Sequence, residues 1–98
     1  MFVNIIKTYR DIVAICDSDL IGKKFVEGEF QLDVKESFFK GKEESTEKVR
    51  EIMTEMIQED ATFNIIGEES TKTALEVGII SVENIKKIQG IPFALILK

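Results

Sequence analysis

The pattern of apolar and polar residues predicts that the first part of the chain consists mainly of strands. Strands are expected over residues 2–9, 11–17 and 29–34. The second strand contains five consecutive apolar residues, Ile12 to Cys16, which is typical of a central strand covered on both faces. The third strand alternates, and its inward-facing residues are expected to be Phe30, Leu32 and Val34. The connections at 17–28 and 35–41 are expected to be irregular, with at most one helical turn.

The remainder of the chain predicts two helices among further strands. Residues 45–58 place five apolar side chains along one helix face: Val49, Ile52, Met53, Met56 and Ile57. A short strand is expected over 62–66 and a second helix over 68–77, which Gly78 ends as a left-handed residue. A capped turn at 81–84 and two last strands, at 84–89 and 91–97, complete the chain.

This order of elements, with a run of strands before mixed units, favours the α+β class. We expect a single compact domain over residues 1–98, built from a mixed or antiparallel sheet of about five to six strands with two helices. No internal repeat, low-complexity tract or linker interrupts the sequence. No run of about 18 apolar residues is present, so we expect no membrane-spanning helix.

The composition favours a binding or accessory protein over an enzyme. The sequence has no histidine, which removes the usual general base near neutral pH and the commonest ligand of transition metals. Its one cysteine, Cys16, lies in the most apolar stretch beside Asp17, so we interpret it as a core residue rather than a nucleophile. The single cysteine and the lack of a recognisable signal peptide favour a cytoplasmic location. We predict no catalytic residues, no cofactor and no metal site.

The net charge of −5 is concentrated in one segment of the chain. Residues 43–60 hold seven acidic and two basic residues, whereas the rest of the chain holds 11 of each. The overall charge argues against broad, non-specific binding of nucleic acid, which needs many contacts from lysine and arginine to phosphate. A local basic patch is still compatible with this distribution, and the acidic helix could instead contact a partner protein.

Lysines recur in close pairs outside the acidic segment: Lys23 and Lys24, Lys40 and Lys42, and Lys86 and Lys87. Two of these pairs lie near phenylalanines, namely Phe25 for the first pair and Phe38 and Phe39 for the second. Basic loops with aromatic residues suit RNA, because bases stack on the rings and lysines contact phosphates. The six lysines are therefore the candidate contacts to RNA or to a partner. The alternative is an ordinary solvated surface above phenylalanines in the core.

Two further sites are weaker hypotheses. Asp17, Asp19 and Glu27 could bind Mg²⁺ or Ca²⁺, but the residues that follow do not complete a calcium loop, and capping and solvation explain these carboxylates. Gly67 opens the second predicted helix, a position where anions can bind to free N–H groups. The first turn of that helix carries Glu68 and Glu69, which would repel a phosphate.

Several segments taken together resemble a known family, the small archaeal proteins grouped as domain of unknown function 424. The segments are CD-x-x-L-IGK-x-F-x-EG (16–28), LDVKESFFKG (32–41), AT-x-NIIGE (61–68), A-x-x-x-G (74–78) and I-x-GIP-x-A (88–94). The resemblance covers nearly the whole chain and rests on their order and spacing. Two departures from the expected pattern are Phe39, where a tyrosine is expected before the x-Gly ending, and Phe93, where a histidine is expected.

The resemblance implies an archaeal, cytoplasmic protein of compact α/β content and of unestablished function. No catalytic or binding residues are carried over from the family. The leading hypothesis from the sequence is a non-enzymatic protein associated with RNA or the translation machinery, in contact with RNA or a ribosome-associated protein and with no membrane. The alternative is a protein-interaction or self-assembling subunit that uses a sheet edge or the acidic helix and makes no contact with nucleic acid.

Overall fold

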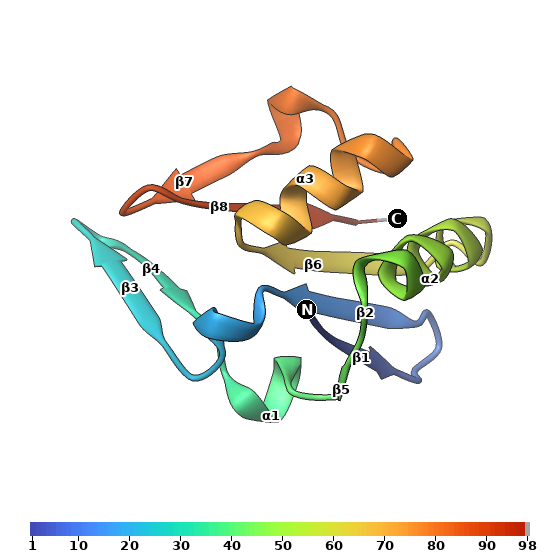
Figure 1. Ribbon diagram of the computed structural model, residues 1–98. Helices are drawn as coiled ribbons and strands as arrows, with labels where there is room; N and C mark the ends of the chain where they lie inside the picture. Colours follow the sequence, from blue (N-terminus) through green and yellow to red (C-terminus); the bar gives the residue numbers. More distant parts are fainter. Residues whose placement is uncertain (98) are drawn as a thin grey trace.

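A mixed six-stranded sheet with the strand order β5-β1-β2-β6-β8-β7 forms the centre of the molecule (Figure 1). The computed structural model describes residues 1–97. The strands are β1 (Phe2–Ile6), β2 (Ile12–Cys16), β5 (Lys42–Glu43), β6 (Thr62–Ile66), β7 (Lys86–Ile88) and β8 (Ile91–Ile96). The central strands β2 and β6 are parallel and the other neighbours are antiparallel. A separate two-stranded hairpin consists of β3 (Lys24–Glu27) and β4 (Phe30–Asp33).

Three α-helices and two short 3₁₀ turns complete the fold. They are α1 (Glu36–Phe39), α2 (Thr46–Gln58), α3 (Glu68–Val77), η1 (Ser18–Leu20) and η2 (Val82–Asn84). The predicted α+β class is therefore confirmed, as are the two longer helices and the strand at Thr62–Ile66. Within residues 1–97, no helix combines the length and the apolar composition needed to cross a membrane.

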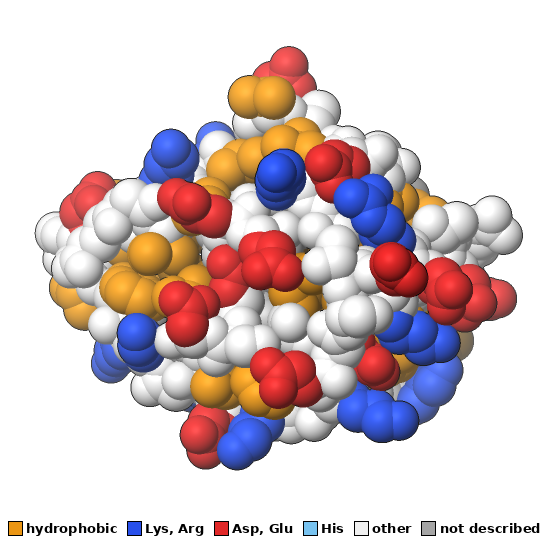
Figure 2. Space-filling view, in the orientation of Figure 1, with side chains coloured by type: hydrophobic (Ala, Val, Ile, Leu, Met, Phe, Trp, Pro, Cys, Tyr) orange, Lys and Arg blue, Asp and Glu red, His pale blue; other side chains and the backbone are white. Residues whose placement is uncertain are grey.

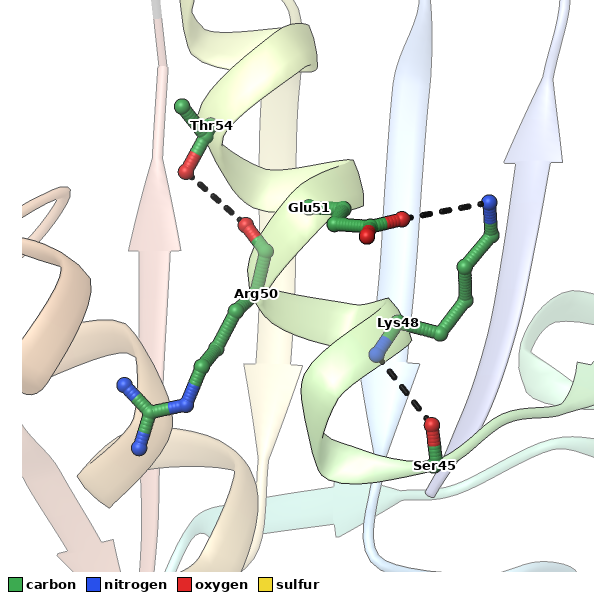
Figure 3. A network of polar contacts seen from close by, with 5 residues as sticks. All are labelled: Ser45, Lys48, Arg50, Glu51 and Thr54. Atoms are coloured by element: carbon green, nitrogen blue, oxygen red, sulfur yellow. Dashed lines mark hydrogen bonds and ion pairs between the residues drawn. The ribbon is translucent and has the colours of Figure 1, made fainter.

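The start of α2 shows how local sequence fixes a helix. The Ser45 hydroxyl oxygen accepts a hydrogen bond from the Lys48 amide at 3.2 Å, which satisfies one of the free N–H groups at the helix start (Figure 3). Lys48 pairs with Glu51 on the exposed side of the helix. Arg50 extends from α2 toward the neighbouring helix and pairs with Glu76 of α3, so the two helices are tied at the surface as well as in the core.

Successive side chains of the central strands point to opposite faces of the sheet, and each face has its own hydrophobic core. Within β2, Val13 and Ile15 face α2 and α3, whereas Ala14 and Cys16 face α1 and the hairpin. The helix-side core also contains the predicted stripe of α2 together with buried residues of β6, chiefly Phe63 and Ile65. The buried residues of the hairpin-side core are Ala14, Cys16, Leu20, Leu32, Val34, Phe39, Ile66 and Ile88.

The structure corrects the predicted number of helices, which is three rather than two. The additional helix, α1, lies in the segment expected to be irregular and has only four residues, too few for a helical period to be visible. It buries Phe39 and leaves Phe38 half-buried against the hairpin-side core. The two-residue strand β5 was missed for the same reason.

The segment expected to be irregular between residues 17 and 28 is also corrected, because it contains the strand β3. A two-residue turn, Gly28-Glu29, joins β3 to β4, and Gly28 adopts a positive φ of 61° that this turn requires. The predicted burial of Phe30 is also wrong. The alternation of its strand predicted an inward position, but the side chain is 70% exposed. It shares the inner side of the hairpin with Leu32 but lies beyond the part that the large sheet covers.

Candidate functional site

A groove lies between the β3–β4 hairpin and the strands β7 and β8. Its volume is about 400 Å³, and it is lined by Glu27, Phe30, Lys86, Lys87, Ile88 and Phe93. Figure 2 shows hydrophobic side chains exposed over the hairpin, at the left of the view, with basic side chains nearby. The groove therefore combines aromatic rings with positive charge, and it lies at the β7 edge of the sheet, opposite the β5 edge.

The hairpin forms one wall of the groove because its inner side chains divide into two groups. Phe25 and Leu32 are opposite each other in the β3–β4 register and pack into the hairpin-side core. Glu27 and Phe30 are the next pair on the same side, adjacent to the turn, and both are exposed. The first pair attaches the hairpin to the sheet, and the second pair is left to line the groove.

The edge strand β7 forms the opposite wall. Lys86 is opposite Phe93 in the β7–β8 register, and Lys87 is opposite Pro92. Within residues 1–97, neither lysine forms an ion pair, and both side chains are exposed. Two lysines are also a device that protects a short edge strand from pairing with other chains. They lie in the same groove as the exposed Phe30 and the half-buried Phe93.

The tip of the hairpin is held to the β7–β8 turn by one residue, Gln89. The Gln89 amide donates to Glu27 Oε1 at 2.8 Å, and Gln89 Nε2 donates to the Val26 carbonyl oxygen at 2.5 Å. Gln89 has a φ of 51° and Gly90 a φ of 77°, which are the paired positive values of a tight hairpin turn. This turn directs Gln89 toward the tip of the hairpin.

The six candidate lysines do not form one patch. Lys86 and Lys87 line the groove on β7, the last strand of the sheet, whereas Lys42 is in β5, the first strand, and Lys40 lies just before it. The remaining two, Lys23 and Lys24, are at the start of the hairpin, where Lys24 is opposite Asp33. The structure therefore separates the candidates into three locations, and the pair on β7 lies in the groove with Phe30 and Phe93.

The carboxylate of Asp17 accepts hydrogen bonds from the first turn of α3. Its two oxygens accept hydrogen bonds from the Glu69 amide at 3.1 Å and from the Ser70 amide at 2.8 Å, and the Ser70 hydroxyl donates to it at 2.7 Å. Asp17 therefore caps α3, which begins after Gly67 and has no capping side chain of its own. The same carboxylate occupies the position at which an anion would bind to the helix start, so neither the cation nor the anion hypothesis gains support here.

Among the residues described, no three histidine, cysteine, aspartate or glutamate side chains are grouped so that they could hold a metal ion. Glu27, the third residue of the cation hypothesis, instead accepts the hydrogen bond from the Gln89 amide. Cys16 is fully buried, and burial together with the nearby Asp17 carboxylate raises the pKa of its thiol to about 11. Its thiolate is therefore scarce at neutral pH, which agrees with the interpretation of Cys16 as a core residue.

Comparison with known proteins shows to which family the chain belongs. A family model described as "Protein of unknown function (DUF424)" matches residues 6–98. The chain belongs to the DUF424 family. It is also similar to a crystal structure described as an uncharacterized conserved protein from Methanopyrus kandleri, with 21% sequence identity, a TM-score of 0.82, and coverage of 99% of this chain and 92% of that chain. At this identity the likeness shows the fold. No curated protein matches the chain.

The groove of this DUF424 protein was not predicted from the sequence as a site. The sequence predicted Lys86 and Lys87 as contacts to RNA or a partner, together with four lysines that lie elsewhere in the structure. It also predicted that Phe30 faces the core. One signal was available, since Phe30 directly follows the Gly28-Glu29 pair, which places it at the turn end of its strand.

Proposed function

We propose that this protein is a non-enzymatic binding protein and that its ligand is single-stranded RNA, bound in the groove between the hairpin and β7. The observation that carries the proposal is the 70% exposed Phe30 ring in a groove that also holds two lysines, neither of which forms an ion pair within residues 1–97. A base can stack on the ring while the lysines contact the adjacent phosphates, an arrangement that many proteins use for single strands.

The chemistry of the groove favours a single strand over a duplex. An exposed ring can stack only on a base whose face is free, and the bases of a duplex are covered by their neighbours. Two lysines also supply too little charge to bind a duplex backbone by electrostatics alone, and the net charge of −5 opposes such binding. Stacking therefore supplies most of the affinity that we expect, and the lysines supply orientation and a moderate salt dependence.

We also propose that the protein acts in the cytoplasm of an archaeon, in association with RNA of the translation machinery. The archaeal source is supported by the similar protein from Methanopyrus kandleri. The single, buried, unpaired cysteine suits a reducing compartment. Sedimentation of a cell lysate with and without RNase examines the association with ribosomal RNA, because an RNase-sensitive comigration is expected.

Fluorescence anisotropy with a labelled ten-nucleotide oligouridylate tests the groove directly. We expect the single strand to bind at low salt and a duplex of equal length to bind more weakly. In the double variant Lys86→Ala/Lys87→Ala, the affinity falls and the slope of log K against log salt becomes shallower by about 1.4, because each lost phosphate contact on a single strand removes about 0.7.

The matched control is the double variant Lys40→Ala/Lys42→Ala, which removes the same charge from the opposite edge of the sheet. It should keep the affinity and the salt slope nearly unchanged. Equal losses in the two double variants would mean that binding depends on overall charge, and the groove would then not be the site. Absence of binding to the single strand, with retained binding of an acidic peptide, would move the function to protein recognition.

A further inference from the structure

Glu27 is the one acidic residue among the side chains that line the groove. Its carboxylate oxygen Oε1 lies 2.8 Å from the Gln89 amide nitrogen and accepts that hydrogen bond. Lys86 and Lys87, on the strand that leads into the Gln89 turn, line the same groove. A carboxylate that borders a groove with two lysines is thus bound by a backbone N–H, and a phosphate oxygen can accept the same kind of hydrogen bond.

The contact is made between two elements that otherwise share no strand pairing. The hairpin forms its own two-stranded sheet, and Gln89 donates two hydrogen bonds to its tip from the β7–β8 turn. Glu27 and its turn neighbours Gly28 and Glu29 are all exposed. Loss of the Glu27 contact therefore weakens the attachment of the tip without removing the buried contacts of Leu32 and Val34 that hold the base of the hairpin.

We propose that the Gln89 amide, with Lys86 and Lys87, is a phosphate subsite, and that Glu27 occupies it in the free protein as an internal, autoinhibitory anion. A phosphate of the ligand displaces the Glu27 carboxylate, accepts the Gln89 hydrogen bond in its place and releases the hairpin tip. This inference rests on the proposed function, since it assigns a phosphate contact and a regulatory contact to the same groove.

Two consequences follow from the competition. Removal of the Glu27 charge increases phosphate affinity, because the displaced group no longer binds the N–H strongly and no longer repels the incoming anion. It also loosens the hairpin tip in the absence of any ligand, because a hydrogen bond from an amide to an amide oxygen is weaker than one to a carboxylate. The second effect distinguishes this contact from a general change of surface charge.

The test compares Glu27→Gln with Glu29→Gln, a matched control that removes the same charge from the adjacent turn. Inorganic pyrophosphate is titrated into each protein while the amide signal of residue 89 is followed by NMR. We expect Glu27→Gln to bind pyrophosphate about tenfold more tightly than the unchanged protein, with the Gln89 signal among those that shift, and Glu29→Gln to change the affinity less than threefold. Amide exchange at Gln89 without ligand should be faster only in Glu27→Gln.

The outcomes separate the inference from the function on which it rests. Equal gains in the two variants, or no shift of the Gln89 signal in Glu27→Gln, would overturn the inference. Binding of pyrophosphate at Gln89 without binding of oligouridylate would retain the anion subsite and reject the RNA function. Thermal unfolding of both variants confirms that each is folded, and both side chains are exposed, so little change in stability is expected.

Discussion

The two faces of the large sheet are covered in different ways. On the helix side, α2 and α3 cover the sheet, and Val13, Ile15, Phe63 and Ile65 are completely buried. On the other side, a one-turn helix and a small hairpin cover the sheet, and the packed residues around the buried ones include several half-buried phenylalanines. The hairpin also leaves Phe30 and the neighbouring groove open.

Under the proposed function, this difference separates the residues that stabilise the fold from those that bind the ligand. Completely buried apolar side chains contribute most to the free energy of unfolding, and they are found on both sides but are larger and more numerous on the helix side. Exposed rings contribute little to stability and are available to a ligand. Substitutions on the two faces should therefore separate cleanly into those that affect folding and those that affect binding.

The largest effect is expected from Phe63→Ala on the helix side. The ring is completely buried, and its removal leaves a cavity that the surrounding helices cannot fill, so the free energy of unfolding should fall by about 3–5 kcal/mol. Denaturant unfolding measures this change. Leu95→Ala, on a residue that is 52% exposed, is the control and should cost less than about 1 kcal/mol. Similar losses in the two variants would contradict the difference between the faces.

The next largest effect is expected from loss of the hydrogen bonds between Asp17 and the start of α3. Asp17, at the end of β2, caps α3 with three hydrogen bonds, so Asp17→Ala should lower the free energy of unfolding by about 1–3 kcal/mol. Asp19→Ala removes an equal charge from an exposed position in η1 and should have little effect. If Asp19→Ala were as destabilising, the cost would come from charge rather than from the cap, and the assignment of Asp17 would be wrong.

Phe30→Ala should show the reverse pattern. Its free energy of unfolding should change by less than about 1 kcal/mol because the ring is mostly exposed. Its affinity for oligouridylate should fall by about 1–3 kcal/mol because a stacking surface is lost. Val26→Ala, on the outer side of the same hairpin and 50% exposed, is the matched control and should bind normally. Unchanged binding by Phe30→Ala would remove stacking from the proposal.

The sequence was sufficient for elements that are long enough to show a period. The apolar stripe of α2, the central strand β2 and the Gly78 end of α3 all carry local signals, and the structure confirms them. Gly78 adopts a left-handed φ of 90° with its amide bonded to the Ala74 carbonyl at 3.0 Å. The four-residue α1 and the two-residue β5 show no period, which is why neither was predicted.

The groove could not be predicted from local patterns because tertiary contacts create it. The alternation of β4 placed Phe30 correctly on the inner side of the hairpin, but burial also depends on how far the sheet extends beneath that side. Gln89 contacts Glu27 over a separation of 62 residues, and Asp17 contacts Ser70 over 53 residues. The three lysine pairs are alike in sequence, and the fold places the pair on β7 in one groove with the exposed Phe30 ring.

An NMR titration of the labelled protein with the ten-nucleotide oligouridylate tests the central claim most directly. We predict that the backbone signals of Phe30, Lys86, Lys87, Gln89 and Phe93 shift together, while those of α2 and of β5 remain in place. Shifts confined to α2 or to the β5 edge would contradict the assignment of the groove. A spectrum that stays unchanged at millimolar RNA would contradict the function itself.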